Sequence, residues 1–193
     1  MADQMTGLLS PFLRARRIAA VRSLLARGRV LDIGCGTGQL AGLVESSRYT
    51  GVDQDEASVA AARREQPAHR FLTTVEFMSA SPQEPFDLIV GLAVIEHIEN
   101  PTAWLTSLRT YLAPTGQVLL TTPHPFGRRI HDLGGRIGVF SREAAEEHHE
   151  FLDRKRMAVV AERAGFRLAR FRPFLLGANQ LFVLEFRASP RSD

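Results

Sequence analysis

The fold is decided by residues 30–53, which read VLDIGCGTGQLAGLVESSRYTGVD. This stretch begins with a short apolar strand at residues 30–33, which leads into a loop with glycine at every second position, residues 34–38. A helix is predicted from about residue 39 to residue 46, and a second apolar strand follows at residues 49–52. Two strands joined through a helix are the repeating unit of parallel sheets, so we expect an α/β fold.

The rest of the chain alternates between predicted helices and strands. Helices are expected at residues 11–27, 55–64, 100–112 and 154–164, and further strands at residues 70–75, 86–92, 117–122, 166–174 and 181–186. Asp55 and Asn100 are the expected helix N-caps, and Pro101 suits the first helical position. The alternation predicts a mostly parallel sheet covered on both faces, whose last two strands form an antiparallel hairpin at one edge. We therefore expect a Rossmann-like three-layer sandwich of about seven strands.

Two segments lie outside this alternation. Residues 1–28 are assigned to an N-terminal helix that ends at Gly28, and Arg14, Arg17 and Arg22 are expected to face water. Residues 123–153 show neither helical nor strand periodicity, and their glycines would allow a mobile lid over a substrate. We expect a single domain over residues 1–193, with residues 123–153 as its substrate segment.

Composition narrows the class of protein. The chain has 193 residues, of which 45% are apolar and 23% charged, as expected for one globular domain. No apolar run is long enough to cross a bilayer and the N-terminus lacks the pattern of a secretory signal, so we expect a cytoplasmic protein. The single cysteine, Cys35, excludes an internal disulfide. A net charge of +3 gives little support to nucleic-acid binding.

The glycine loop and its acids indicate a ligand. The dinucleotide pattern G-x-G-x-x-G would need glycine at position 39, which is Gln39, so a nicotinamide cofactor is disfavoured. Asp32 precedes the first glycine by two residues, where it would repel a pyrophosphate and suit a cationic ligand. S-adenosylmethionine (SAM) carries an ammonium and a sulfonium group. Asp53, at the end of the second strand, can accept hydrogen bonds from both ribose hydroxyls.

Four stretches in order resemble the class I SAM-dependent methyltransferases. Residues 30–38 resemble the first motif of that family, and Asp53 falls at its ribose-binding acid. Residues 86–90 resemble the motif on its fourth strand, and residues 112–117 the turn before its fifth. The resemblance implies SAM as the cofactor and a seven-stranded sheet with an antiparallel last strand.

The resemblance also implies which residues contact the cofactor. Three glycines would line its methionine part, three residues would lie near its adenine, and the end of the fourth strand would lie beside it. The expected set is Asp32, Gly34, Gly36, Gly38, Asp53, Gln54, Thr74, Val75, Leu92 and Ala93.

Residues 94–98 resemble a stretch of the ubiquinone-biosynthesis O-methyltransferases and related small-molecule enzymes. Some of those enzymes bind magnesium there through two glutamates and a histidine. Ala93 stands in place of the first glutamate, so Glu96 and His97 form an incomplete set and we expect no metal. Glu96 and His97 are expected to fix the turn after the strand. His97 also remains a candidate base.

An oxygen nucleophile benefits from a base, and histidine is suited to that role near neutral pH. His124 directly follows the fifth strand, at the carboxyl edge where the methyl group should point, and is the first candidate by position. His149 and His97 are the others. Residues 149–153 and 177–181 faintly resemble methyltransferases linked to polysaccharide or glycolipid clusters, which suggests a glycan acceptor.

The sequence thus predicts methyl transfer from SAM to a small-molecule or glycan acceptor, at oxygen. An RNA or protein methyltransferase stays an alternative, although residues 91–94 lack the Asn/Asp-Pro-Pro-aromatic run of exocyclic-amine enzymes. A non-catalytic SAM-binding module is a second alternative. The acceptor and the oligomeric state are not predicted.

Overall fold

The computed structural model of this protein describes residues 2–26, 28–80, 84–124 and 152–187, and for residues 2–10 the backbone alone. No helix in these ranges is long and apolar enough to cross a membrane.

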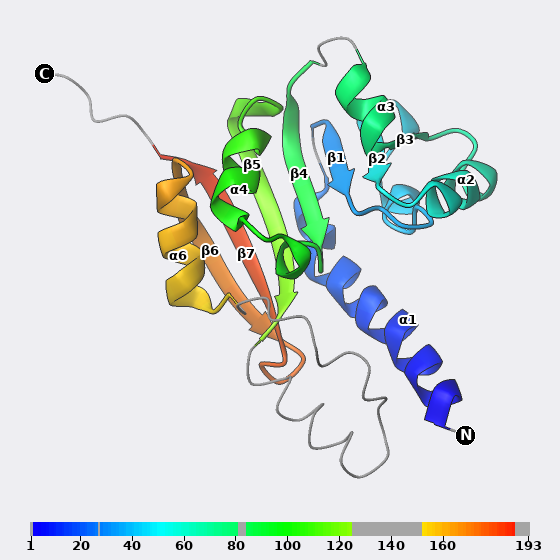
Figure 1. The fold of residues 1–193 in the computed structure, drawn as a ribbon, viewed down its shortest axis with the longest axis horizontal. Coiled ribbons are helices and arrows are strands. Elements are labelled where there is room, and N and C mark those ends of the chain that lie inside the picture. Colours follow the sequence, from blue (N-terminus) through cyan, green and yellow to red (C-terminus); the bar gives the residue numbers. More distant parts are fainter. Residues whose placement is uncertain (1, 27, 81–83, 125–151, 188–193) are drawn as a thin grey trace, which may run out of the picture.

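The described residues form one seven-stranded sheet with the order β3-β2-β1-β4-β5-β7-β6 (Figure 1). Its strands are β1 (Val30–Ile33), β2 (Tyr49–Asp53), β3 (Arg70–Thr73), β4 (Phe86–Leu92), β5 (Leu112–Pro123), β6 (Phe166–Phe174) and β7 (Asn179–Phe186). Strands β1 to β5 run parallel, and β7 is antiparallel to both β5 and β6. The predicted α/β sandwich with an antiparallel C-terminal hairpin is therefore confirmed.

The chain order reverses between β1 and β4. From β1 the sheet continues through β2 and β3 on one side, and through β4 and β5 on the other. In open α/β sheets, ligands bind beyond the carboxyl ends of the strands at such a switch point. The fold therefore places its natural binding site between the ends of β1 and β4.

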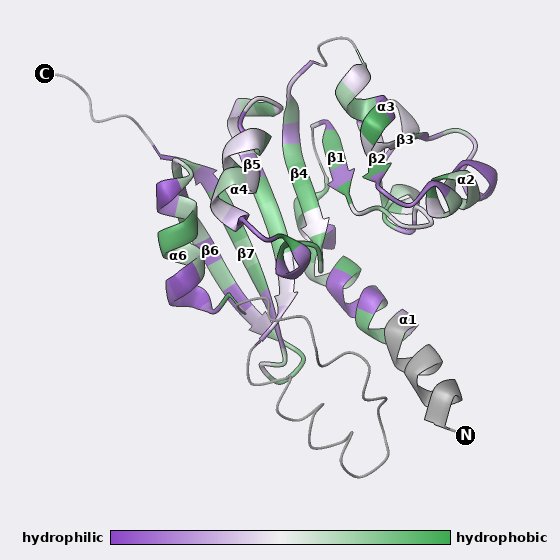
Figure 2. Ribbon diagram, viewed as in Figure 1, coloured by the Kyte–Doolittle hydropathy of each residue, from purple (hydrophilic) through white to green (hydrophobic). Residues whose placement is uncertain are grey.

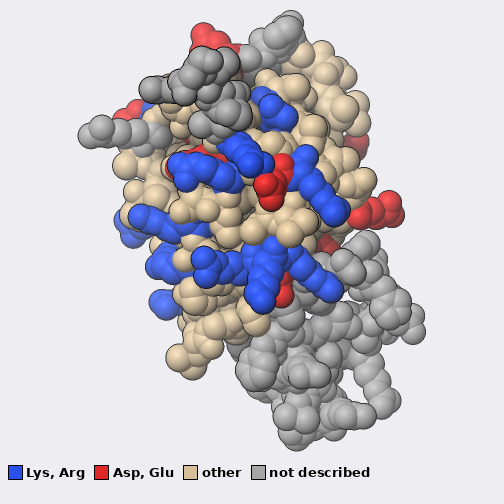
Figure 3. All heavy atoms as spheres, turned by 90° about the vertical axis from the view of Figure 1, so that its left-hand side faces the viewer, with Lys and Arg blue, Asp and Glu red and all other residues tan. Residues whose placement is uncertain are grey.

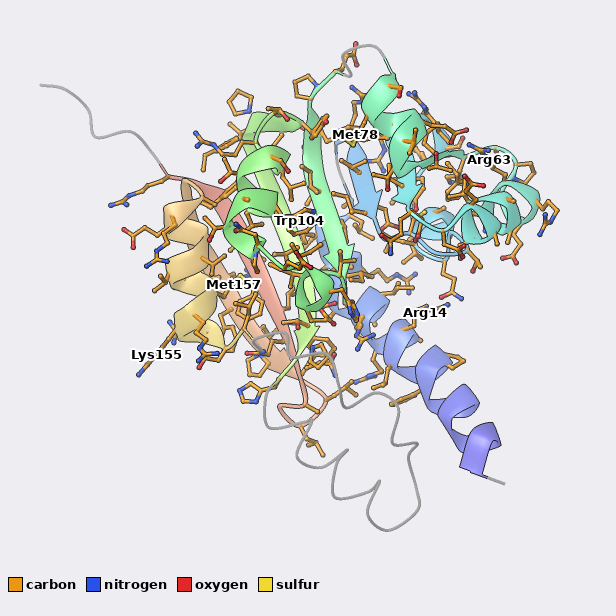
Figure 4. The ribbon with its side chains drawn as sticks, viewed as in Figure 1. Arg14, Arg63, Met78, Trp104, Lys155 and Met157 are labelled. Carbon is orange, nitrogen blue, oxygen red and sulfur yellow. The ribbon has the colours of Figure 1, made fainter. Side chains whose placement is uncertain are left out.

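Helices cover both faces of the sheet. They are α1 (Ala2–Val21), α2 (Glu56–Glu65), α3 (Thr74–Ser79), α4 (Pro101–Leu108) and α6 (Arg154–Arg163). One buried core joins the sheet to α4 and α6 through Leu105 and Met157, and the other joins it to α1 and α2 through Val21 and Val59. Figure 2 shows the apolar central strands, and in Figure 4 Met157 points to the sheet while Lys155 points away. The result is three layers.

Local capping explains where three of the helices begin. Asp55 accepts hydrogen bonds from the backbone N–H groups of Ala57 and Ser58, and Asn100 accepts one from Ala103, as the sequence predicts. Thr73 and Glu76 form a reciprocal capping box. This box starts α3 at Thr74, so the strand predicted to run to residue 75 ends two residues earlier.

The predicted helix at residues 39–46 is wrong. The chain makes turns after Gly38, a 3-10 helix at Ala41–Leu43 and another at Ser46–Arg48. Gly38, directly before this segment, has a φ of +80° and forms part of the turns, and Gly42 within the segment lowers its helix propensity. Leu40, Ala41 and Val44 are still buried, so tertiary packing holds the segment without a regular helix.

Candidate active site

The glycine loop is fixed to β2 by its backbone. The amides of Gly34 and Cys35 both donate to the carbonyl of Val52, at 2.8 and 3.1 Å. Gly34, Gly36 and Gly38 all have positive φ, at +71°, +53° and +80°, which explains the glycine at every second position.

The three loop glycines differ in what surrounds them. A Cβ on Gly34 would meet Val94 Cγ2 at 2.5 Å, and one on Gly38 would meet the Phe71 ring at 2.6 Å. A Cβ on Gly36 would meet nothing within 4 Å. Close packing therefore accounts for Gly34 and Gly38, whereas at Gly36 the backbone borders open space that a ligand can enter.

Asp53 ties the loop to the end of β2. Its Oδ2 accepts a hydrogen bond from the Gly36 amide at 2.8 Å, and its Oδ1 accepts one from the Asp55 amide at 3.0 Å. A carboxylate has about four acceptor sites, so each oxygen can still accept a hydroxyl. Gln54 is exposed beside it.

A cleft of about 310 Å³ lies beyond β1 and β4, at the switch point. Its lining residues come from α1, from β1 with the glycine loop and the turn after it, and from the end of β4 with the segment that follows. They are Arg14, Arg17, Ile18, Asp32, Gly34, Cys35, Gly36, Gln39, Leu40, Leu92, Ala93 and His97. Six of these were predicted as site residues, namely Asp32, Gly34, Gly36, Leu92, Ala93 and His97.

Other predicted site residues lie outside this cleft lining. Thr74 and Val75 occupy the first turn of α3, where Val75 is 75% exposed. His124 follows β5, is half-buried, and donates its backbone N–H to the Ala178 carbonyl at 2.9 Å. His149 and most of the proposed substrate segment fall outside the described residues.

Sequence reasoning missed the two arginines that α1 contributes. Arg14 and Arg17 line the cleft, and Figure 4 labels Arg14 on α1. Arg17 is half-buried and donates from Nε to Asn179 Oδ1 at 3.1 Å, so the prediction that it faces water is wrong. A polar helix face looks the same in sequence whether it meets water or a charged cleft.

Burial lowers the pKa of Arg17. The nearby Glu96 carboxyl opposes this shift, whereas the Arg14 guanidinium adds to it. An arginine in a protein keeps its charge despite such a shift. The cleft therefore holds two guanidinium cations on its α1 side.

Asp32 supplies the opposite charge from β1. Its side chain is 3% exposed, and Oδ2 accepts a hydrogen bond from the Tyr49 hydroxyl at 2.7 Å. Burial raises the pKa of Asp32 to about 7. The Tyr49 hydrogen bond works against that rise, and the charge of Asp53 adds to it.

The chain after β4 turns sharply at Ala93, whose φ of +59° is uncommon for a residue with a side chain. Its amide donates to the Thr121 carbonyl at 2.9 Å, and a 3-10 helix, Ile95–His97, follows. Backbone strain of this kind clusters at functional sites, where the surrounding structure keeps the residue in its unfavourable conformation.

Burial raises the pKa of Glu96, opposed by the charges of Arg17 and His97 and by a hydrogen bond from Thr122. Its Oε2 atom is buried and has no hydrogen-bond partner among the described residues. His97, the next residue, is exposed at the cleft.

Among the described residues, no group of three or more His, Cys, Asp or Glu side chains is placed to hold a metal ion.

With this geometry in place, comparison with known proteins identifies the family. The methyltransferase domain family matches residues 4–170. The chain therefore belongs to this family of class I SAM-dependent methyltransferases, and its cofactor is SAM.

Individual relatives agree with this assignment. The ubiquinone biosynthesis O-methyltransferase of Stutzerimonas stutzeri is 33% identical over 106 residues, which cover 51% of this chain and 45% of the relative. The match thus spans less than half the length of that relative.

Two solved structures share the fold. The magnesium protoporphyrin IX methyltransferase of Synechocystis PCC 6803 with bound S-adenosylhomocysteine has a TM-score of 0.70 at 17% identity, over 92% of this chain and 84% of that one. An S-adenosylmethionine-dependent methyltransferase from Mesorhizobium loti has a TM-score of 0.64 at 16% identity, over 86% and 95%.

Proposed function

We propose that this protein transfers a methyl group from SAM to an oxygen atom of a small-molecule or glycan acceptor. The observation that carries the proposal is the charge arrangement of the cleft. Asp32 lies on its β1 side, Arg14 and Arg17 lie on its α1 side, and Gly36 borders open space. The methionine part of SAM carries an ammonium and a carboxylate, which pair with an acid and a guanidinium respectively.

Residues at and just after the ends of β2, β3 and β4 are assigned to the other parts of SAM. Asp53, already held by the Gly36 amide, has acceptor capacity left for the ribose hydroxyls. Gln54, Thr74 and Val75 are assigned to the adenine side, and the exposed Val75 offers apolar surface on the first turn of α3. Leu92 and Ala93 would lie beside the reacting end of the cofactor.

Bound SAM supplies an electrophilic methyl group on a good leaving group. The main task of the protein is therefore to align the acceptor oxygen with that methyl group and to exclude water. A base would then remove the hydroxyl proton from the acceptor. His97 lines the cleft, His124 follows β5 at the same edge of the sheet, and His149 is the third candidate.

The choice of oxygen rests on the histidines and on the relatives. Relatives named ubiquinone biosynthesis O-methyltransferase match about half of this chain, and their name specifies transfer to oxygen. In this proposal Arg14 and Arg17 bind the carboxylate of the cofactor, so they do not select the acceptor. We assign acceptor specificity to residues 123–153 instead.

A second candidate acceptor is RNA, because basic side chains gather on one face of the protein. Figure 3 shows Lys and Arg side chains gathered on the face that carries α6 and β6, with few acidic ones between them. Glu162 on α6 pairs with Arg187, which follows β7, and Glu185 on β7 pairs with Arg167 on β6. Other exposed basic residues on α6 and β6 are Arg154, Lys155, Arg156, Arg163, Arg170 and Arg172.

The test is a methyl-transfer screen with SAM labelled in its methyl group. Small metabolites with hydroxyl groups, glycans and RNA are the three acceptor sets. We expect label in a hydroxyl-bearing small molecule or glycan, and none with Asp53→Ala, which removes the ribose ligand. Label in RNA alone, with a strong loss of binding as salt is raised, would establish the second candidate instead.

A further inference from the structure

We propose that Tyr49 is a positioning residue that holds the Asp32 carboxylate ready for the ammonium group of SAM. The inference rests on the proposed function, because it assigns Asp32 to the cofactor. Tyr49 lies on β2 and does not line the cleft, so it acts through Asp32 and not by contact with the ligand.

The sheet register explains how Tyr49 reaches Asp32. Tyr49 is paired with Val30 across β1 and β2, and Asp32 is paired with Gly51. Tyr49 and Asp32 are therefore diagonal neighbours on one face, within reach of an aromatic side chain. Gly51 lies opposite Asp32 and has no side chain there, because a Cβ would meet the Phe71 ring at 2.6 Å.

The hydrogen bond uses one carboxylate oxygen and leaves the other to the cleft. The Tyr49 hydroxyl donates to Asp32 Oδ2 at 2.7 Å, with both residues buried at 2% and 3% exposure. The Tyr49 hydroxyl is the side-chain donor that acts on this carboxylate, and Asp32 lines the cleft. One oxygen is thus anchored, which directs the other to the ligand.

The Tyr49 ring is itself held in place. It meets the His69 ring edge-on at 5.5 Å between centroids and the Phe71 ring at 5.6 Å. His69 in turn bonds through Nε2 to the Val44 carbonyl at 2.9 Å. The hydroxyl therefore cannot swing away from Asp32 without disturbing this aromatic cluster.

Several charged and titratable groups surround Asp32. Asp53 and the Cys35 thiol lie on the side of β2 and the glycine loop. Arg14 and Arg17 approach from α1, and His97 from the segment after β4. Burial and the charge of Asp53 disfavour the charged carboxylate, and the hydrogen bond from Tyr49 favours it.

The hydrogen bond from Tyr49 decides how much of Asp32 is charged near neutral pH. Burial already raises the pKa of Asp32 to about 7, and the hydrogen bond from the Tyr49 hydroxyl lowers it. Without the hydroxyl, the pKa rises further, so at pH 7 a larger share of Asp32 is the neutral acid. A neutral acid attracts an ammonium group far less than a carboxylate does.

The test measures S-adenosylhomocysteine binding to the full chain by calorimetry, from about pH 5 to about pH 9. For Tyr49→Phe, which keeps the ring, we expect the acidic limb of the affinity profile to move up by about one pH unit. Affinity near pH 7 should then be up to about tenfold weaker. Tyr111→Phe, which also removes a phenol hydroxyl and keeps the ring that packs against Phe77, is the matched control and should leave the profile unchanged.

Asp32→Asn gives an independent second measurement. This variant keeps the shape of the side chain but cannot ionise, so its profile should lose the acidic limb, and adding Tyr49→Phe should then shift nothing. An unshifted limb in Tyr49→Phe, a loss of affinity equal at every pH, or an intact limb in Asp32→Asn would each overturn the inference. Failure of the unaltered protein to bind S-adenosylhomocysteine at any pH would overturn the proposed function as well.

Discussion

Arg17 donates from Nε to Asn179 Oδ1 at 3.1 Å, which joins α1 to the first residue of β7. A second bond nearby runs from Arg172 on β6 to the Ala20 carbonyl at 2.7 Å. The C-terminal hairpin therefore holds α1 against the sheet, and α1 carries the two guanidinium groups of the cleft. In this way the strands added at the sheet edge help to build the cleft that we propose as the cofactor site.

The first prediction concerns this connection. Asn179→Ala removes a buried partner of a half-buried cation, so we expect a loss of about 1–3 kcal/mol in the free energy of unfolding. Affinity for S-adenosylhomocysteine should fall as well, because Arg17 is no longer held at the cleft. Urea unfolding and calorimetry measure the two effects.

The matched control for this change is Arg16→Ala, at an exposed position on the same helix. It should alter stability by no more than about 0.5 kcal/mol and leave affinity unchanged. Equal effects of the two variants would mean that the bond between Arg17 and Asn179 does not organise the cleft.

The second prediction separates the packing glycines from the ligand-facing one. Gly34→Ala places a methyl group 2.5 Å from Val94 Cγ2, so it should lower the melting temperature strongly. Gly36→Ala meets no atom within 4 Å and bears only the cost of its φ of +53°, about 1–2 kcal/mol. Its methyl group occupies space assigned to SAM, so affinity should fall by about tenfold or more.

Thermal unfolding and calorimetry on both variants check this prediction. A Gly36→Ala protein that binds S-adenosylhomocysteine as the unaltered protein does would show that the open space beside Gly36 is not the cofactor site.

The third prediction links Asp32 to stability. The pKa of Asp32 in the folded protein is about 7, above its ordinary value of 3.8, so between these values the folded state binds more protons than the unfolded state. Stability from this group is therefore complete below about pH 4 and is lost as pH rises through about 7. Glu96, whose pKa is also raised, acts in the same direction.

Asp32→Asn cannot lose a proton and should remove most of this dependence. Compared with the unaltered protein, the variant should gain free energy of unfolding at about pH 8 relative to about pH 5, on the order of a few kcal/mol. It should also bind S-adenosylhomocysteine poorly, which would make Asp32 a site acid kept at a cost in stability. Urea unfolding at both pH values measures this difference. If the free energy of unfolding changed with pH by the same amount in both proteins, this account would be contradicted.

Local signals explain what the sequence could predict. Asp55 and Asn100 cap the helices they were expected to cap, because a cap depends on atoms three residues away. The apolar runs of β1 and β4 are equally local. The helix expected at residues 39–46 failed because burial of Leu40 and Val44 in the tertiary core satisfied the same apolar pattern without a helix.

Contacts between distant residues explain what the sequence could not predict. The site role of Arg17 depends on Asn179, which lies 162 residues further along the chain. The bond between Tyr49 and Asp32 depends on the exact register of β1 and β2, which apolar periodicity does not specify to one residue. Both contacts became visible only once the strands were paired.

The last prediction distinguishes the candidate bases. His97 lines the cleft, whereas His124 follows β5 and is bound through its backbone to Ala178. If His97 removes the acceptor proton, His97→Ala should lower kcat by about 100-fold or more and leave S-adenosylhomocysteine affinity nearly unchanged. His124→Ala is the comparison variant, and in that case its kcat should change far less. If His124→Ala lowered kcat more than His97→Ala, the base would lie at the end of β5, as its position in the sequence suggests. Equal and small losses of kcat in both variants would make alignment of the acceptor the main source of the rate.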